Sequence, residues 1–344
     1  MVTTIGIDPH KATHTAVAIN GSETVLGELT IPADRYQTRK LIDWAAELDG
    51  GGRIWAVEAA GGLGHLLSHQ LIANGEQVVD VPPVLASRVR LLGSGRSDKN
   101  DPNDARSVAI AALRQPGLVV VQREDHTQVL RMLAKRHLEL TGLRTQAACR
   151  LHAVVLQLRP GGIARRLSAQ NAARMLQGMR NLDTVGNRRR TMARTHLADI
   201  RRYDREIKAN KVVISEAVAA SNTTVTEIYG VGPVVAALLI GYTSNIGRFA
   251  SADHYAAYNG TAPIEVSSGG KKRHRLSMRG NRVLNHAIHM AAVTQIRHDT
   301  PGRIYYDKKQ AEGKTRKEAL RALKRRISDV VYRELVADQQ TKTG

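Results

Sequence analysis

The chain has 344 residues, of which 51 are Lys or Arg and 31 are Asp or Glu, so its formal net charge is +20. An excess of this size indicates a polyanionic partner, nucleic acid before an acidic membrane face. The single cysteine, Cys149, excludes a disulfide framework and any zinc site built from several cysteines. Aromatic residues make up only 3%, which disfavours a protein that grips single strands mainly by base stacking.

The longest apolar run, residues 231–240, is far shorter than the ~20 residues that a membrane span needs. The N-terminus has no basic segment followed by an apolar one, the pattern of a signal peptide. We therefore expect a cytoplasmic protein with no membrane partner. At roughly 150 residues per domain, the length predicts about two domains.

The first third of the chain alternates strand and helix patterns. Three strands are expected at 3–7, 13–19 and 24–31, the last two joined by an Asn20-Gly21 turn. Helical spacing follows at 34–48, 63–73 and 102–113, with strands between them at 53–57 and 77–81. Three strands followed by alternating helices and strands is the order of the ribonuclease H arrangement. It predicts an α/β domain of the ribonuclease H type over residues 1–122.

The rest of the chain is expected to be helical. Apolar residues recur at three- and four-residue steps over 125–158 and again over about 192–218, with Arg188, Arg189 and Arg190 before the second run. Two long basic helices indicate an antiparallel pair or a dimeric coiled coil across 123–222, although a solvated basic face on an ordinary bundle is the alternative. Residues 223–344 are expected to form a mainly α-helical C-terminal domain, with helices near 282 and 317.

Four acidic residues are placed to meet. Asp8 and Glu58 end the first and fourth predicted strands, which are neighbours in a ribonuclease H sheet, and Asp101 and Asp104 lie one turn apart at a helix start. Carboxylates gathered in this way repel one another unless a cation lies among them, and Mg²⁺, with Mn²⁺ as substitute, suits such oxygen ligands. Two such ions would assist phosphodiester chemistry.

Each acid also has an ordinary interpretation. Asp8 before Pro9 caps a turn, and Asp101 before Pro102 is a good helix cap whose capping box Asp104 completes. Glu58 is a solvated residue at a strand end in this interpretation. Asp98 is a rival for one of the two helix acids.

The C-terminal region holds a second set of candidates. Gly230 and Gly232 open a predicted helix and offer backbone amides to an anion, an arrangement that resembles helix-hairpin-helix DNA binders, although a tight turn between helices explains it too. Ser267 and Ser268 precede Gly269-Gly270 and a run of basic residues. A serine there is a nucleophile in one interpretation and part of a flexible loop in the other. The candidate phosphate contacts are Lys271, Lys272, Arg273, Arg275, Arg279 and Arg282, together with the basic residues of 314–326.

Two histidine pairs occur at helical spacing, His65 with His69 and His286 with His289. Neither pair has an evident third ligand in the sequence. We interpret both as ordinary helix histidines.

The ordered combination of motifs resembles the DEDD transposases of the IS110 group of insertion sequences. The matching pieces are Ile-Gly-Ile-Asp8-Pro-His-Lys, Val-Glu58-Ala-Ala-Gly, Asp101-Pro-Asn-Asp104-Ala-Arg, and a stretch from Tyr229 to Arg282 with Gly-Val-Gly-Pro, Tyr-Asn-Gly-Thr-Ala-Pro and Ser-Gly-Gly-Lys. The resemblance spans nearly the whole chain and is weakest from about 160 to 222. The acidic motif fits Asp98 with Asp101 or Asp101 with Asp104, and the following Ala105-Arg106 favours the second.

The resemblance implies a bacterial, nucleoid-associated recombinase. Asp8, Glu58, Asp101 and Asp104 match a RuvC-like metal tetrad, and Ser268 matches a serine that bonds covalently to DNA, with Ser267 as the neighbouring alternative. It also implies donor and target DNA as substrates, a noncoding bridge RNA as guide, and a homodimer that assembles to a tetramer. A RuvC-like nuclease that uses water and a non-catalytic nucleic-acid-binding protein are the alternatives.

Overall fold

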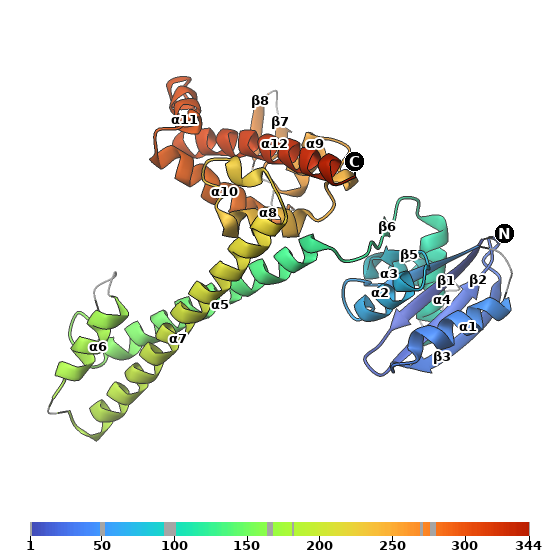
Figure 1. Cartoon of the computed structure of the whole chain (residues 1–344), viewed down its shortest axis with the longest axis horizontal. Helices are drawn as coiled ribbons and strands as arrows, with labels where there is room; N and C mark the ends of the chain where they lie inside the picture. Colours follow the sequence, from blue (N-terminus) through green and yellow to red (C-terminus); the bar gives the residue numbers. More distant parts are fainter. Residues whose placement is uncertain are drawn as a thin grey trace. The chain divides into compact units, whose positions relative to one another are not determined.

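The computed structural model describes residues 2–48, 52–92, 101–163, 168–180, 182–268, 271–275 and 280–343. The chain divides into two compact units, 1–124 and 125–344. Figure 1 labels the elements in chain order. Among the described helices, none combines the length and the apolar character needed to cross a membrane.

The first unit is built on one mixed sheet of six strands, in the order β3-β2-β1-β4-β5-β6. Strands β1, β2 and β3 pair antiparallel, β1, β4 and β5 pair parallel, and β6 is antiparallel to β5. The elements are β1 (Thr3–Pro9), β2 (Thr13–Ile19), β3 (Val25–Pro32), α1 (Gln37–Leu48), β4 (Arg53–Glu58), α2 (His65–Ala73), β5 (Val78–Val81), α3 (Pro83–Leu92), α4 (Asp101–Arg114) and β6 (Val119–Val120). The expected α/β class of this region is confirmed.

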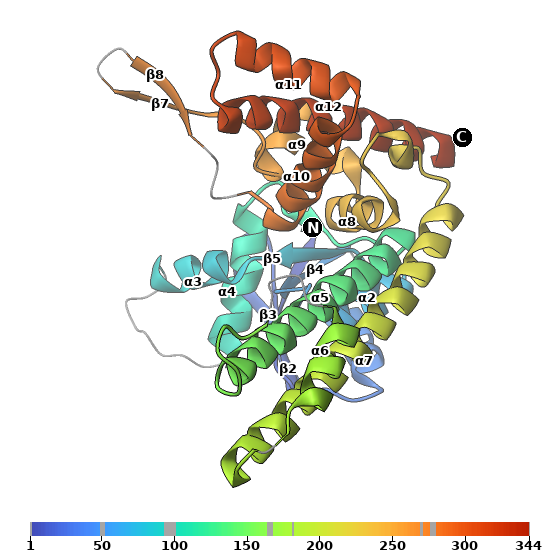
Figure 2. The same ribbon diagram turned by 90° about the vertical axis from the view of Figure 1, so that its left-hand side faces the viewer.

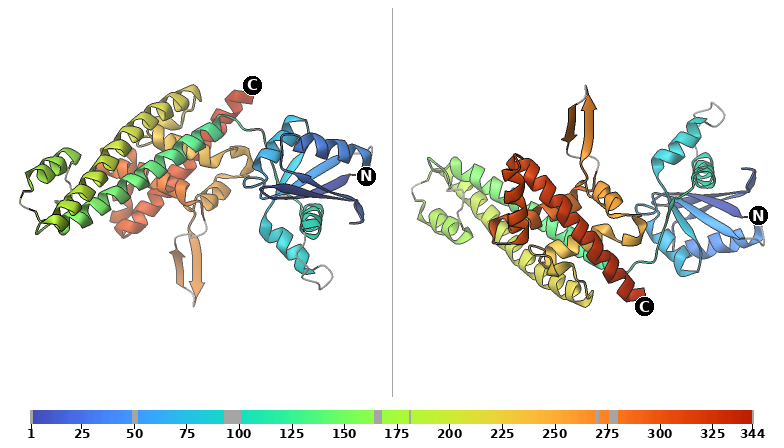
Figure 3. Two further views of the ribbon diagram at one scale, coloured as in Figure 1. Left: turned by 90° about the horizontal axis from the view of Figure 1, so that it is seen from below. Right: turned by 90° about the horizontal axis from the view of Figure 1, so that it is seen from above.

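Helices cover both faces of this sheet (Figure 3). On one face, Ile5, Ile7 and Val57 pack against apolar residues of α1 and α2. On the other face, Ala56 packs against apolar residues of α3 and α4. Successive residues of a strand point to opposite faces, so the parity of a residue fixes which helices it meets.

The second unit is helical apart from one ribbon of two strands. Its elements are α5 (His126–Leu156), α6 (Ala169–Gly178), α7 (Thr184–Ala220), η1 (Val225–Glu227), α8 (Pro233–Thr243), η2 (Ile246–Arg248), α9 (Ala252–Tyr258), β7 (Ile264–Ser268), β8 (Lys271–Arg275), α10 (Arg282–Arg297), α11 (Pro301–Ala311) and α12 (Arg316–Thr343). Figure 2 shows α5 and α7 side by side with α6 near one end. Arg136 of α5 bonds Glu206 of α7 at 2.9 Å, and Arg144 bonds Asp204 at 2.5 Å.

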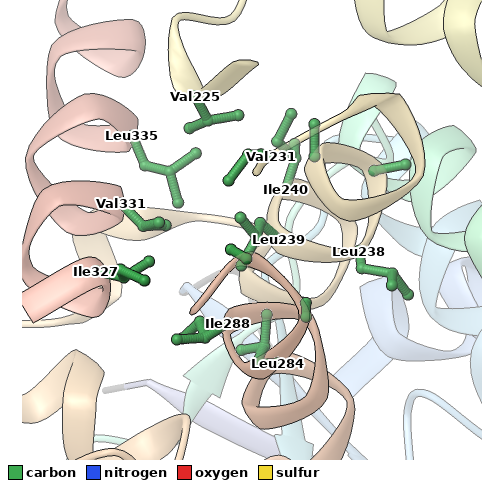
Figure 4. Close-up of a cluster of buried hydrophobic side chains, with 14 of the residues drawn as sticks. Val225, Val231, Leu238, Leu239, Ile240, Leu284, Ile288, Ile327, Val331 and Leu335 are labelled. Atoms are coloured by element: carbon green, nitrogen blue, oxygen red, sulfur yellow. The ribbon is translucent and has the colours of Figure 1, made fainter. Parts of the chain in front are cut away.

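The helix α8 is the centre of this unit. Its sequence Pro-Val-Val-Ala-Ala-Leu-Leu-Ile-Gly is apolar all round, as expected of a helix enclosed by others. Leu238, Leu239 and Ile240 are at most 4% exposed and pack with apolar residues of α10 and α12 (Figure 4). A β-carbon at Gly241 would lie 2.5 Å from the backbone nitrogen of Arg131, so glycine is what allows α5 to approach α8 this closely.

Several elements differ from the sequence-based expectation. The second long helix begins at Thr184, so Arg188, Arg189 and Arg190 lie within it; the side chain of Asp183 accepts the Gly186 amide and caps the earlier start. Helices α3, α6, α9 and α11 were not expected. The expected basic loop begins with a strand, β8, which pairs antiparallel with β7 before it, and this ribbon extends away from the neighbouring helices (Figure 3).

Candidate metal centre

Asp8 and Glu58 end neighbouring parallel strands on the same face of the sheet. In the register, Gly6 pairs with Ala56 and Ile7 with Val57, so Asp8 and Glu58 come next in both strands. Ala56 belongs to the cluster against α3 and α4, and Glu58, two residues on, has the same parity. Asp8 shares the parity of Gly6, which faces α4. Both carboxylates therefore lie on the α4 side.

Gly6 sets the distance between this face and α4. A β-carbon at Gly6 would lie 2.1 Å from the carbonyl oxygen of Ala105 and 2.5 Å from the backbone nitrogen of Ala109. Real β-carbons do not approach backbone atoms so closely. The glycine in Ile-Gly-Ile-Asp therefore brings the first turn of α4, with its acids, against the strand that carries Asp8.

Asp101 and Asp104 lie one turn apart at the start of α4. Asp104 is 8% exposed, Asp8 is 9% exposed, and Asp101 is exposed. One ligand atom from each of Asp8, His10 and Asp101 lies within 4.8 Å of the other two. Three of the four acids proposed from sequence, Asp8, Asp101 and Asp104, are thus placed where β1 meets the start of α4.

Glu58 completes the convergence. Partial burial and the negative charges of Asp8 and Asp104 raise the pKa of the Glu58 carboxyl. Arg90 and His10 act in the opposite direction, but less strongly. A carboxyl group whose pKa is raised by two neighbouring carboxylates lies in a region of negative electrostatic potential.

Within the part of the chain that the structure describes, Arg90 and His10 border the acids. Arg90 of α3 forms an ion pair with Asp104, and His10 Nδ1 lies 3.8 Å from Asp8 Oδ2. Among the described residues, four carboxylates gather with the single guanidinium of Arg90, so these five groups together are negatively charged. The carboxylate oxygens fit Mg²⁺, and the adjacent imidazole is also acceptable to Mn²⁺, so the residues present suit a divalent ion.

The turn after Glu58 is held in an unusual conformation. Ala59 has φ of 48°, a left-handed geometry that costs a non-glycine residue of order 1 kcal/mol. The side chain of Asp80 accepts the amide of Ala60 at 2.8 Å, and Ala59 donates to the Val81 carbonyl at 3.1 Å. A β-carbon at Gly64 would meet Val57 at 2.4 Å. Hydrogen bonds to β5 and the close packing of Gly64 thus fix the conformation of the chain that follows Glu58.

The candidate nucleophile lies in the other unit. Ser268 is the last residue of β7 and pairs with Lys271, while Ser267 pairs with Lys272. The strand β8 carries Lys271, Lys272, Arg273 and Arg275. Asp98, Gly269, Gly270 and Arg279 lie outside the described residues.

The remaining candidates for nucleic-acid contact divide into two groups. Arg188 and Arg282 are exposed, and Gly232 is the exposed N-cap of α8. By contrast, Arg190 donates to the Met179 carbonyl at 2.7 Å, which joins α6 to α7. Gly230, with φ of 87°, would place a β-carbon 2.8 Å from the Ala291 carbonyl, so close packing against α10 explains this glycine.

Only some of the basic side chains in segment 314–326 are exposed. Lys324 is 7% exposed, and Arg325 bonds Asp253 at 2.5 Å and Asp329 at 3.0 Å. Lys324 donates to Asn285 of α10, so this candidate phosphate contact points toward another helix. Arg326 is exposed and lies over the ring of Tyr305.

Sequence reasoning missed His10, Arg90 and Asp80. His10 lies two residues after Asp8, and its place in the Asp-Pro-His motif could have indicated that it lies close to this acid. Arg90 belongs to a helix that was not expected, and Asp80 looked like one polar residue in an apolar strand. Their roles depend on strand pairing and helix packing, which the sequence pattern does not specify.

Comparison with known proteins now decides the family. A DEDD transposase model of the IS110 type matches residues 5–160, and a model described as "Transposase IS116/IS110/IS902 family" matches residues 222–307. The chain belongs to this transposase family. The first match contains all four acids of the cluster, and the second contains the ribbon with Ser268.

Relatives of this transposase come from other insertion elements. The 44.8 kDa protein of IS116 from Streptomyces clavuligerus is 26% identical over 95% of this chain and 93% of its own length. The 42 kDa protein of IS900 from Mycobacterium paratuberculosis is 28% identical over 95% of this chain and 94% of its own. The 43.6 kDa protein of IS110 from Streptomyces coelicolor is 36% identical over 31% of this chain and 27% of its own.

Proposed function

We propose that this transposase cuts and rejoins DNA strands with Asp8, Glu58, Asp101 and Asp104 as ligands of divalent metal ions. The convergence of the acids supports this: the charges of Asp8 and Asp104 raise the pKa of Glu58, and Asp101 lies beside Asp8. A bound Mg²⁺ or Mn²⁺ would polarise the scissile phosphate and favour an ionised attacking oxygen. The four acids would hold the ions, and β1, β4 and α4 fix the acids relative to one another.

We infer a RuvC-like fold for the first unit. The order β3-β2-β1-β4-β5 supports it, with an antiparallel β1–β3 meander followed by parallel β4 and β5. In an open sheet of this kind, functional groups gather beyond the carboxyl ends of the parallel strands. Asp8 and Glu58 lie at those ends.

We propose Ser268 as the nucleophile, with Ser267 as the alternative. Its oxygen forms a bond to phosphorus while the bond from phosphorus to the 3′ oxygen breaks. The serine proton is lost to a base, and the departing 3′ oxygen takes up a proton. The product is a 5′-phosphoserine and a free 3′-OH. Reversal with a new 3′-OH rejoins DNA without ATP, because the ester keeps the energy of the phosphodiester.

Matched serine variants test this step. The full-length protein is incubated with Mg²⁺ and a plasmid that carries the element and its flanks, and the reaction is stopped with detergent. We expect protein attached to a 5′ DNA end in the wild type and in Ser267→Ala, and none in Ser268→Ala. Cleavage by Ser268→Ala with free 5′-phosphate ends would instead establish a nuclease that uses water. Unchanged activity in both Asp8→Asn and Glu58→Gln would exclude metal catalysis by this cluster.

We further propose that the two parts of the site come from different subunits of a tetramer assembled from homodimers. The acids and Ser268 belong to separate units of the chain, which supports such sharing. Mixing Asp8→Asn with Ser268→Ala subunits tests it. Restored activity in the mixture, with neither variant active alone, supports exchange between subunits. A mixture as inactive as its components contradicts it.

We also propose that a structured noncoding bridge RNA guides the choice of donor and target DNA. The net charge of +20 and the 3% aromatic content support a protein that holds backbones while base pairing reads sequence. Sequencing the RNA that copurifies with the protein tests this proposal. One discrete structured species is expected, and random host fragments would contradict guidance.

A further inference from the structure

A second group of ligating side chains lies in the first unit and takes no part in the proposed reaction. His65 and His69 are one turn apart on α2, and their ring centroids are 4.5 Å apart with the planes at 64°. Glu124 follows β6, and its Oε1 is 3.2 Å from His65 Nε2. One ligand atom from each of the three lies within 4.8 Å of the other two.

The composition of this group distinguishes it from the acidic cluster. Two imidazoles with one carboxylate are the donors that zinc and similar transition ions take, whereas Mg²⁺ prefers oxygen alone. Two histidines four residues apart share a helix face, so one ion can reach both rings. Among the described residues, the other histidine pair, His286 with His289, has no third ligand grouped with it.

We propose that His65, His69 and Glu124 form a second metal site, which takes a transition ion of the Zn²⁺ class. Three protein ligands leave a fourth position for water or another group. The two histidines are half-buried on α2, and Glu124 reaches them from an exposed segment.

Occupation of this site would restrain the end of the first unit. Glu124 is its last residue, and residues 121–125 have no regular secondary structure. Residues 122–125 are exposed, Arg123 among them. An ion shared by Glu124 and α2 would fasten this segment to the helix. The peptide bond after Arg123, a trypsin site, would then be less accessible to the protease.

Metal titration of the full-length protein is the first test. Excess Mg²⁺ is kept present to occupy the acidic cluster, and Co²⁺ is added while its visible absorption is recorded, followed by displacement with Zn²⁺. We expect one equivalent of Co²⁺ with an imidazole-bound spectrum. Changes outside the ligands of metal sites already weaken binding ~10- to 100-fold, so His69→Gln and Glu124→Gln should each weaken it at least as much.

The matched control is the double variant His286→Gln/His289→Gln, which removes two histidines and leaves the site intact. It should bind Co²⁺ as the wild type does. Glu124→Gln changes an exposed residue outside regular structure, so its fold is expected to persist. Equal Co²⁺ binding by the wild type and Glu124→Gln, or no binding at all, would overturn the proposal and leave an ordinary ion pair between His65 and Glu124.

Limited trypsin digestion gives an independent readout. Zn²⁺ should slow cleavage after Arg123 in the wild type and leave the rate unchanged in Glu124→Gln. Because both proteins meet the same Zn²⁺ concentration, direct inhibition of trypsin would slow both equally. Equal slowing would count against the metal site.

Discussion

Gly6 of β1 and Ala105 of α4 are in such close contact that a β-carbon on Gly6 would lie 2.1 Å from the Ala105 carbonyl oxygen. The backbones of the strand that carries Asp8 and of the helix that carries Asp104 are therefore in direct contact. Ala105 and Ala109, both fully buried, keep the facing side of the helix small. The distance between the acids is set by the absence of a side chain at Gly6.

Gly6→Ala should separate β1 from α4. The added methyl group meets backbone atoms that have no side-chain freedom to move, so we expect the free energy of unfolding to fall by about 3 kcal/mol. Mg²⁺ affinity should fall as well, because Asp8 and Asp104 move apart. Chemical denaturation and metal titration measure the two effects. The control is Gly21→Ala, which has nothing within 4 Å and should change stability by less than about 0.5 kcal/mol.

Glu58→Gln should stabilise the metal-free protein while it removes catalysis. Its folded-state pKa is raised, so the ionised form opposes folding. Stability is therefore greatest below the unfolded-state pKa and is lost as pH rises through the folded-state pKa. The variant should melt higher than the wild type at pH 7 without metal, and the difference should vanish in acid. Cleavage should fall roughly a thousandfold or more, since a metal ligand is lost. A lower melting temperature at pH 7 would contradict the raised pKa.

Arg90→Gln should make folding depend on metal. The guanidinium of Arg90 pairs with Asp104, whose side chain is 11% exposed, and it is the cation that the described structure places closest to the cluster. Its loss removes the ion pair of the nearly buried Asp104, and we expect a cost of about 1–3 kcal/mol without metal. Added Mg²⁺ should restore most of that stability, and less Mg²⁺ should suffice for half-saturation because a competing cation is gone. Thermal unfolding across a Mg²⁺ series measures both, and weaker Mg²⁺ binding by the variant would show that Arg90 supports the ion.

Lys324→Met should raise stability at pH 7 and flatten its pH dependence. Burial lowers the pKa of Lys324 to about 8, below its ordinary 10.5. The unfolded chain therefore binds more protons between these values, and the wild type gains stability as pH rises from 8. Lys324 donates to Asn285 at 2.5 Å, and losing that bond offsets part of the benefit, so we expect a gain of about 1–2 kcal/mol. Denaturation at pH 7 and pH 9.5 tests it, with exposed Lys317→Met as the control; a variant less stable at pH 7 would contradict it.

The first unit could be predicted far better than the second, for a physical reason. Its strands are short, apolar and separated by clear turns such as Asn20-Gly21, so the periodicity identifies them. Helix α3 was missed because Pro83 looked like the end of a strand, although proline is also favoured in a first helical turn. Because the sequence pattern did not predict α3, the ion pair between Arg90 and Asp104 could not be predicted either.

Contacts between distant segments account for the other differences. The third ligand of the His65–His69 pair, Glu124, comes from far along the chain, and no spacing rule connects it to α2. Gly230 looked like an anion-binding glycine, but the carbonyl that explains it belongs to α10. Residue types identify the candidate functional residues. Choosing between a structural and a functional role for each of them requires knowledge of its contacts.

The length of α7 has a consequence for any duplex that lies along it. Its 37 residues, at about 1.5 Å each, span about 55 Å, compared with about 34 Å for one turn of B-form DNA. Four basic residues are exposed along its central part, namely Arg194, Arg201, Arg205 and Lys208. They follow one another at steps of seven, four and three residues, so they share one face of α7, and a duplex lying along that face would meet positive charge over about 21 Å, roughly two thirds of one DNA turn.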